Sequence, residues 1–331
     1  VALSARWIPG PRIIDDAYIT FRYSRNLIAG EGLVYNPGEK VLGTTTPIYS
    51  LLMAGLGVLT GGEDANFPLL ALIVNALADA VTAVYIWRIG KKCGYEIAGI
   101  ASGLVWGIAT YSVTFAIGGL ETSLYVMLLT IAVWAYTSGK RFTTTIVLSF
   151  AVLTRPDAVI LVGLIGLDWL LRYIRHDRSI IRMRDVLGFV IPVATWVIFS
   201  TLYYGSPIPH SIQAKIGAYL LSPDAAFIRL IQHFATPFQG DLFLGPTAIA
   251  IGLVIFPALF IIGSRAAIGN ISEIKSWVFY PIAYFLFFAI ANPLIFRWYL
   301  TPPLTPYLFF ILVGLERLLR QISISKKLFK F

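Results

Sequence analysis

The sequence contains apolar runs long enough to cross a lipid bilayer, and these runs constrain its fold more than any other feature. The clearest runs are Phe67–Trp87, Val186–Tyr203, Pro246–Ile262 and Trp277–Ala291. A helix needs about 20 apolar residues to cross roughly 30 Å of hydrocarbon. The composition agrees, because 57% of the residues are hydrophobic and 13% are charged, whereas soluble domains have about 25% charged residues. We therefore expect an all-α integral membrane protein built as a polytopic helical bundle.

Apolar runs and helix-breaking residues together predict about nine spanning helices. The expected ranges are 66–88, 96–115, 121–137, 142–155, 157–173, 186–204, 244–263, 276–293 and 300–318. Two of them are short and flank Arg155-Pro156-Asp157, so they could be half-helices or a hairpin. The segment 47–61 is apolar but too short to span. We expect it to form a helix on the outer interface that begins at Pro47.

Basic residues cluster in alternate loops of this topology. If the loop 88–95 is cytoplasmic, alternation places most Lys and Arg residues on the cytoplasmic side, which is the positive-inside pattern. The outer side then carries the segment 1–65 and the loop 205–243, with 66–331 forming the bundle. We expect a plasma-membrane protein whose active site faces the exterior. The net charge of +9 does not indicate a nucleic-acid partner, because the basic residues lie in short clusters between apolar runs.

The densest polar segment runs from Asp15 to Leu27 and predicts a short helix that ends before Gly30. Helical spacing places Asp15, Arg22 and Asn26 near one face, with Arg25 on the adjoining face. An Asp at such a position is commonly a helix cap, and Asp–Arg contacts are often solvated ion pairs. Because two acids are adjacent, one can cap the helix while the other serves as a general base.

Other polar residues are expected on the outer side, close to the ends of spanning helices. They are Glu121, Arg155, Asp157, His210, Lys215 and Arg297. Each also has a structural explanation. The helix dipole favours an acid such as Glu121, Arg155 can pair with Asp157, and Arg297 can anchor in an aromatic belt. His210 and Lys215 are also typical of an interfacial loop.

A base, several cations and an apolar groove on the outer face are what sugar transfer from a polyprenyl phosphate requires. Nucleotide sugars are cytoplasmic, so an outward-facing enzyme needs a donor held in the bilayer by its prenyl chain. Arg or Lys residues then stabilise the leaving phosphate. A carboxylate takes the proton of the acceptor hydroxyl, which typically accelerates transfer by roughly 10²–10⁴-fold.

The alternative is a transporter or lipid flippase that uses the same charged residues. A transporter is expected to place its polar groups at mid-membrane on broken helices. Apart from Asp79, the candidate polar groups of this chain are predicted to cluster at one surface. Asn75, one turn from Asp79, offers a hydrogen-bond explanation for that buried acid.

Several motifs resemble those of GT-C membrane glycosyltransferases. The first outer segment carries Asp15-Asp16-Ala17-Tyr18-Ile19 with Arg22, followed by Gly43-Thr44-Thr45-Thr46-Pro47. The later motifs are Gly118-Gly119-Leu120-Glu121-Thr122, Leu153-Thr154-Arg155-Pro156-Asp157, Gly205-Ser206-Pro207-Ile208-Pro209-His210 with Lys215, and Phe296-Arg297-Trp298-Tyr299. The pattern is most similar to the terminal arabinofuranosyltransferases of cell-wall assembly, and more distantly to protein O-mannosyltransferases and aminoarabinose transferases.

This resemblance implies an inverting transfer from a polyprenyl-phosphate-linked sugar to a hydroxyl of a glycan, lipid or protein. It implies that Asp15 or Asp16 is the general base, and Asp15 is preferred because it aligns with Arg22. The residues implied to bind the donor phosphate and sugar are Arg22, Arg25, Glu121, Arg155, His210, Lys215 and Arg297. No metal ligand is assigned, although Asp15, Asp16 and Glu121 leave a divalent cation open. His210 replaces the Asn typical of the family, and we expect a further helix before the acidic segment.

Overall fold

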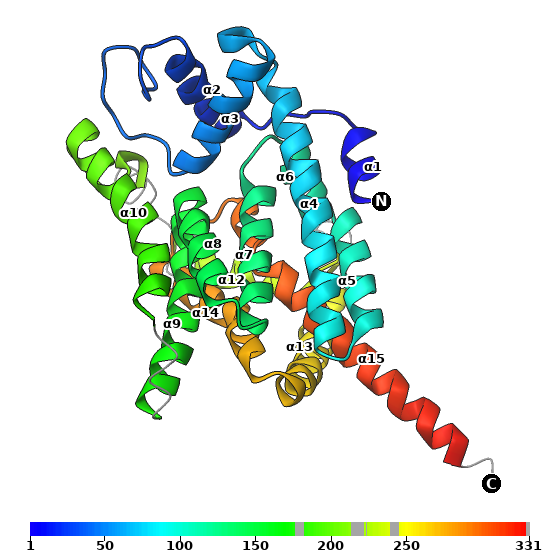
Figure 1. Cartoon of the computed structure of the whole chain (residues 1–331). Coiled ribbons are helices and arrows are strands. Elements are labelled where there is room, and N and C mark those ends of the chain that lie inside the picture. Colours follow the sequence, from blue (N-terminus) through cyan, green and yellow to red (C-terminus); the bar gives the residue numbers. More distant parts are fainter. Residues whose placement is uncertain (176–181, 213–221, 223, 239–244, 329–331) are drawn as a thin grey trace.

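The computed structural model describes residues 1–175, 182–212, 222, 224–238 and 245–328. These described residues form helices and loops and contain no β-strand. The all-α architecture expected from the sequence is therefore confirmed for the described part of the chain (Figure 1).

Two helices of the N-terminal segment lie together at one end of the molecule (Figure 1). They are α2 (Asp15–Ile28) and α3 (Pro47–Thr60). Ala17 and Phe21 of α2 pack with Tyr49 and Met53 of α3 in one buried apolar cluster. Pro47 occupies the first position of α3, as expected from the sequence. This packing fixes which face of α2 is turned toward the rest of the protein.

The first half of the bundle follows these two helices. It consists of α4 (Phe67–Lys92), α5 (Glu96–Ile108), α6 (Thr110–Ile117), α7 (Thr122–Thr137), α8 (Arg141–Thr154), α9 (Val159–Ile174) and α10 (Met183–Tyr204). The Asn66 side chain caps α4 by accepting a hydrogen bond from the Leu69 N–H. Residue 94 after α4 has a φ of +77°, a conformation that glycine adopts without strain. These signals set both ends of α4.

The second half contains α12 (Ala225–Ala235), α13 (Gly245–Asn270), α14 (Lys275–Ala291) and α15 (Leu304–Leu328). A short 3₁₀ helix, η6 (Arg297–Leu300), precedes α15. The helices α13 and α15 approach each other closely at two glycines. A Cβ atom on Gly263 would lie 1.9 Å from the carbonyl oxygen of Phe310, and one on Gly314 would lie 2.1 Å from that of Leu259. Small residues permit such close packing of helices in membranes.

By length and composition, five described helices are able to cross a membrane, or six if the bent pair of α5 and α6 forms one span. The expectation of about nine spans is therefore not confirmed. The ranges 121–137, 142–155 and 157–173 do form helices, but α7 and α9 have 16 residues each and α8 has 14. At about 1.5 Å per residue, such helices are shorter than the roughly 30 Å of hydrocarbon. The chain is an integral membrane protein.

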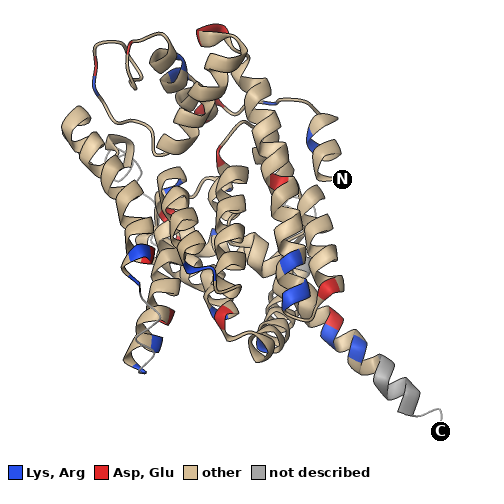
Figure 2. Cartoon of the chain, viewed as in Figure 1, with Lys and Arg blue, Asp and Glu red and all other residues tan. Residues whose placement is uncertain are grey.

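Charged residues are distributed unevenly along the bundle (Figure 2). Lys and Arg residues of α4 and α15 lie at the end of the bundle away from α2 and α3. The distribution has the form expected from the positive-inside rule, and the orientation in the membrane stays a prediction.

A fully buried ion pair joins the N-terminal helix α1 (Ala2–Trp7) to α4. The Arg6 Nε lies 2.9 Å from the Asp79 Oδ2, and both side chains are 0% exposed. Trp106 and Ser123 also donate hydrogen bonds to the Asp79 carboxylate. The buried charge of Asp79 is therefore neutralised inside the bundle.

The sequence suggested Asn75 as the partner of Asp79, and the structure corrects this. The Asn75 side chain instead donates hydrogen bonds to the carbonyl oxygens of Ala116 and Leu120. Ala116 lies in the last turn of α6 and Leu120 in the connection to α7, so Asn75 holds this part of the chain against α4.

Candidate active site

A cavity of about 470 Å³ with a mostly apolar lining opens beside α2, at the junction of α8 with α9 and at the start of α7. The charged residues in its lining are Asp16, Glu121, Arg155 and Asp157. Apolar and aromatic residues form the other walls, and they include Ile19, Leu120, Val159, Phe287, Phe288, Trp298 and Tyr299. The cavity therefore offers a carboxylate-rich region next to an apolar surface.

Arg155 lies at the centre of the charged cluster and is only 4% exposed. Its Nε donates to the Asp157 Oδ1 at 3.0 Å, and its Nη1 donates to the Glu121 Oε1 at 3.3 Å. Tyr284 donates a hydrogen bond to the Asp157 Oδ2 at 3.1 Å. The pairing of Arg155 with Asp157, suggested by the sequence, is confirmed. Two carboxylates therefore bind one guanidinium, and burial raises the pKa of the Glu121 carboxyl above its usual value.

Local backbone signals place this cluster at the cavity. The helix α8 ends at Thr154 because Pro156 follows, and the residue before a proline avoids the helical region. Arg155 accordingly has extended backbone angles, with φ −152° and ψ 131°. Glu121 immediately precedes α7, where the helix dipole favours an acid. Both side chains therefore reach the cavity from helix ends.

Aromatic rings enclose the guanidinium of Arg155. Its Cζ lies 4.6 Å from the ring centroid of Tyr299 and 5.2 Å from that of Tyr125. Cation–π contacts of this kind are strengthened when the cation is desolvated. Tyr125 and Tyr284 were not among the residues selected from the sequence. They lie in apolar helices outside any motif, so only their contacts identify them.

One face of α2 contributes to the cavity through Asp16, Ile19 and Thr20, which are spaced by three and four residues. Asp16 is half-buried, whereas Asp15 is exposed and is not part of the lining. The apolar residues Ala17 and Phe21 pack against α3. This packing rotates α2 so that position 16, rather than position 15, meets the cavity.

The structure also corrects the expected direction of Arg22. The Arg22 Nε donates to the carbonyl oxygen of Tyr35 at 2.8 Å, and its Nη2 donates to the Asn36 Oδ1 at 3.1 Å. Asn26 donates to the same Tyr35 carbonyl at 2.9 Å. Arg22 and Asn26 do share a face, as predicted, but that face binds the loop after α2 because backbone carbonyls of this loop need donors.

Arg25 is likewise directed away from the cavity. Its Nη2 lies 3.6 Å from the Asp64 Oδ1, and both side chains are largely exposed. An exposed pair of this type contributes little to stability. Arg297, in η6, is exposed and absent from the lining, whereas its neighbours Trp298 and Tyr299 belong to it.

The segment after α10 reaches the cavity through Ser211 and Ile212. His210 is half-buried, and its backbone N–H donates to the Leu42 carbonyl at 2.8 Å. Within the described part of the chain, its Nδ1 is buried and has no hydrogen-bond partner. Lys215 lies outside the described residues. The donor-binding roles expected for His210 and Lys215 therefore stay predictions.

Among the residues that the structure describes, no group of three or more His, Cys, Asp and Glu side chains is arranged to hold a metal ion. Asp16, Glu121 and Asp157 share the cavity, but Glu121 and Asp157 both bind Arg155. A half-buried carboxylate beside aromatic walls is able to accept a proton from a hydroxyl. Aromatic surfaces of this type can pack against a sugar ring or an apolar chain.

Comparison with solved structures shows a known fold. The chain superimposes on ArnT from Cupriavidus metallidurans bound to undecaprenyl phosphate with a TM-score of 0.68 and 16% sequence identity. The match covers 96% of this chain and 59% of that one. The apo structure of the same protein matches with a TM-score of 0.65 and 15% identity, over 95% of this chain and 57% of that one.

Sequence comparison finds two relatives. A terminal β-(1→2)-arabinofuranosyltransferase of Corynebacterium glutamicum is 29% identical over 235 residues, covering 61% of this chain and 33% of that protein. Its counterpart in Mycobacterium tuberculosis is 28% identical over 233 residues, covering 64% of this chain and 35% of that protein. The matches span about a third of the length of these curated relatives.

These comparisons confirm the resemblance to GT-C glycosyltransferases that the sequence motifs indicated. The model of the Alg9-like mannosyltransferase family matches residues 46–214. This range includes Glu121, the Arg155-Pro156-Asp157 turn and the segment after α10. Since it covers about half of the 331 residues, the chain belongs to the Alg9-like mannosyltransferase family.

Proposed function

We propose that the chain transfers a sugar from a polyprenyl-phosphate donor to an acceptor hydroxyl in the cavity beside α2. The observation that carries this proposal is that the Asp16 carboxylate and the Arg155 cluster share one cavity with a wall of aromatic and apolar side chains. A lipid-linked sugar has the same division, because a polar sugar and phosphate are joined to a long apolar chain. Family membership and the ArnT-like fold support the same class of reaction.

In the proposed reaction, Asp16 is the general base. The acceptor oxygen attacks the anomeric carbon of the donor sugar while the bond from that carbon to the phosphate oxygen breaks. The hydroxyl proton passes to the Asp16 carboxylate, and the polyprenyl phosphate leaves with the bonding electrons. Attack from the face opposite the phosphate inverts the configuration at the anomeric carbon. Asp16 is preferred over Asp15 because only Asp16 belongs to the lining.

The Arg155 cluster is proposed to position the donor. Arg155 is held by Glu121 and Asp157, so its orientation is fixed before a ligand enters. The guanidinium then lies near the phosphate as negative charge develops on the leaving group. Protonation of Glu121, whose pKa is raised by burial, would leave Asp157 as the only acidic partner of Arg155 among the described residues. His210 and Lys215 are proposed as further residues that bind the phosphate. Trp298 and Phe288 offer apolar surface in the same cavity for the sugar or the first prenyl units.

The cavity is proposed to face the non-cytoplasmic side of the plasma membrane. Basic residues of α4 and α15 lie at the opposite end of the bundle (Figure 2), and basic residues favour the cytoplasmic side. A donor carried in the membrane is required at the proposed side, where nucleotide sugars are absent.

The sugar is the least constrained part of the proposal. The curated relatives are arabinofuranosyltransferases, whereas the matching family model describes mannosyltransferases. Both sugars are therefore to be tested as polyprenyl-phosphate donors. A glycan, a lipid or a protein is able to supply the acceptor hydroxyl.

The test is transfer of radiolabelled sugar by the full-length protein in proteoliposomes. Donors are polyprenyl-phosphate arabinose and polyprenyl-phosphate mannose, and extracted envelope material supplies acceptors. We expect Asp16→Asn to lower the rate of transfer by roughly 10²–10⁴-fold, which is the usual contribution of a general base. Asp15→Asn is the matched comparison, because it removes the same charge from the adjacent, exposed position.

The two variants separate the possible assignments. Loss of transfer in Asp15→Asn alone would return the role of base to Asp15, and wild-type rates in both variants and in the double variant would refute an Asp base. Donor binding that persists without any transfer by the wild-type protein would indicate a non-enzymatic lipid-binding role. The ion pair of Asp79 with Arg6 argues against a transporter that uses Asp79, because the charge of this acid is already neutralised within the bundle.

A further inference from the structure

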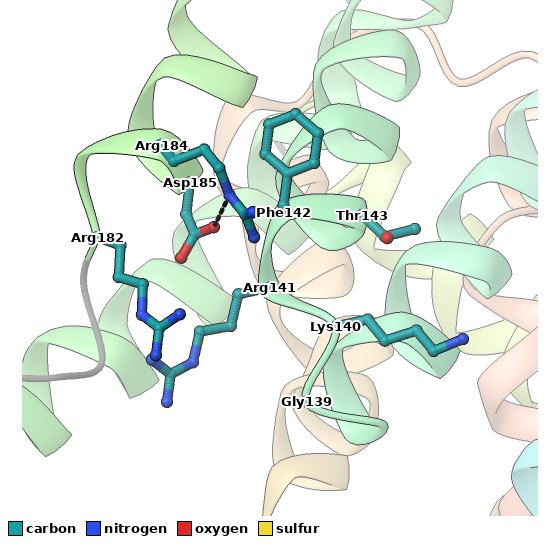
Figure 3. A pocket seen from close by; sticks show the side chains of 8 residues that line it. All are labelled: Gly139, Lys140, Arg141, Phe142, Thr143, Arg182, Arg184 and Asp185. Atoms are coloured by element: carbon teal, nitrogen blue, oxygen red, sulfur yellow. Dashed lines mark ion pairs between the residues drawn. The ribbon is translucent and has the colours of Figure 1, made fainter.

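A second cavity, of about 460 Å³, lies between the start of α8 and the start of α10. Its charged lining residues are Lys140, Arg141, Arg182, Arg184 and Asp185 (Figure 3). The lining therefore contains four basic side chains and a single acid. We refer to this cavity as the basic cleft.

The basic cleft and the candidate active site lie at opposite ends of the same two helices. The cleft is next to Arg141 at the start of α8, and the active-site cavity is next to Arg155 just beyond its end. The 14 residues of α8 extend over roughly 20 Å. The helix α10 runs from the cleft toward Ser211 in the same way. The two cavities are therefore separate sites.

The side chains of the cleft differ in their surroundings. Lys140 points away from the two neighbouring arginines in Figure 3, and its Nζ lies 4.5 Å from the ring centroid of Trp134. The guanidinium of Arg184 stacks over Phe142 at 5.0 Å. The side chains of Arg141 and Arg182 extend toward the same part of the cleft in Figure 3. Guanidinium groups gathered in this way favour an anion, and a phosphate matches their fork of donors.

The buried carboxylate of Asp185 requires hydrogen-bond donors from whatever binds in the cleft. It is 1% exposed, and within the described residues neither of its carboxylate oxygens accepts a hydrogen bond. The Arg184 Nε is 3.8 Å from the Asp185 Oδ1, which is an ion pair beyond hydrogen-bond distance. A buried carboxylate without donors is costly. A ligand that carries hydroxyl groups beside its phosphate would supply these donors.

The surface next to the cleft is apolar and belongs to a helix able to cross the membrane. Met183, Leu187 and Ile191 are spaced by four residues along α10, and all three are exposed. Only 11% of the apolar part of α10 is buried within the protein. A ligand that binds its charged group in the cleft therefore has an apolar track for hydrocarbon chains directly beside it.

We propose that the basic cleft binds an anionic phospholipid whose headgroup contains both a phosphate and free hydroxyls, such as phosphoglycerol. The phosphate lies against Arg141 and Arg182, a headgroup hydroxyl donates to the Asp185 carboxylate, and the acyl chains lie along α10. Basic pockets between membrane helices are known to bind such headgroups. This assignment does not depend on the proposed glycosyl transfer.

The test measures binding of short-chain phosphatidylglycerol to the purified full-length protein in a neutral detergent by native mass spectrometry. The cleft variant is Arg141→Gln with Arg182→Gln. The matched control is Lys275→Gln with Arg317→Gln, which removes two exposed positive charges outside the cleft. We expect the cleft variant to weaken binding by about tenfold to a hundredfold, as for loss of charge-assisted hydrogen bonds. The control variant is expected to bind like the wild type.

Other ligands test whether the phosphate bound in the cleft belongs to a lipid headgroup or to a soluble compound. Phosphatidylcholine with the same acyl chains is expected to bind at least tenfold more weakly, and glycerol 3-phosphate or inorganic phosphate is expected not to compete at the concentration of the lipid. Competition by either soluble compound at that concentration would overturn the lipid assignment. Equal weakening by the cleft and control pairs would show general charge attraction and would also overturn it.

The role of Asp185 is tested separately with phosphatidate, which carries a phosphate but no headgroup hydroxyl. We expect the wild-type protein to prefer phosphatidylglycerol over phosphatidate and Asp185→Ala to lose this preference while it still binds both lipids. A wild-type protein that does not discriminate between these lipids would refute the hydroxyl contact. Far-UV circular dichroism of each variant shows whether its helices are intact, and Arg182→Gln alone supplies a milder variant if the pair misfolds.

Discussion

The buried pair of Arg6 and Asp79 is expected to hold α1 in place. Both side chains are 0% exposed, and the Arg6 Nε lies 2.9 Å from the Asp79 Oδ2. Arg6 also donates to the carbonyl oxygens of Ala2 and Gly107. A charge in such surroundings is stable only while its partner is present. Removal of both partners should therefore cost less than the two single losses added together.

The expected magnitude follows from the donors that Asp79 satisfies. Its carboxylate accepts hydrogen bonds from Arg6, Trp106 and Ser123, so Asp79→Leu leaves three buried donors without this acceptor. Breaking a buried ion pair typically costs about 3–5 kcal/mol. We expect Asp79→Leu and Arg6→Met each to lower the free energy of unfolding by about that amount. The double variant should be less destabilised than the sum by at least about 2 kcal/mol.

The assay is equilibrium unfolding in mixed micelles, followed by far-UV circular dichroism, for the wild type and all three variants. Limited proteolysis of the segment before α2 provides a local measurement, because Arg6→Met should release α1 before the bundle unfolds. Additive losses in the double variant would show that the two charges are not coupled. Unchanged cleavage of the segment in Arg6→Met would refute the proposed anchoring of α1.

Three further outcomes are expected. Arg155→Gln leaves Glu121 and Asp157 without their cation. It should lower the free energy of unfolding by about 3–5 kcal/mol, measured by denaturation, and it should abolish sugar transfer in the radiolabel assay. Tyr284→Phe removes one hydrogen bond to Asp157 and should cost about 0.5–1.5 kcal/mol by the same denaturation; no loss would show that this bond contributes nothing. Gly263→Val places side-chain carbons against the backbone of α15. It should lower the free energy of unfolding by at least about 1–3 kcal/mol. An unchanged free energy of unfolding would contradict the close contact between α13 and α15.

Part of the fold and of the site follows directly from the sequence. The helix α2 begins at Asp15 and ends before Gly30, and α3 begins at Pro47, as the sequence predicted. Among the described residues, no side chain caps α2, so Asp15 marks its start without the expected capping hydrogen bond. The turn at Arg155-Pro156-Asp157 is also local in the sequence, and its internal ion pair is confirmed. The sequence could not give the number of spans, because apolar composition marks α7 and α8 without fixing how long each helix becomes.

The sequence alone therefore determined that the chain is a membrane bundle of helices, and its motifs indicated the family. The tertiary structure decided that Asp16 rather than Asp15 meets the cavity, that Arg22 binds the Tyr35 carbonyl, and that Asp79 pairs with Arg6. Helical periodicity predicts which residues share a face of a helix, because the spacing of residues along the chain is enough to determine it. Which face meets a cavity, and which distant charge becomes a partner, depends on how separate helices pack, and packing is a property of the whole fold.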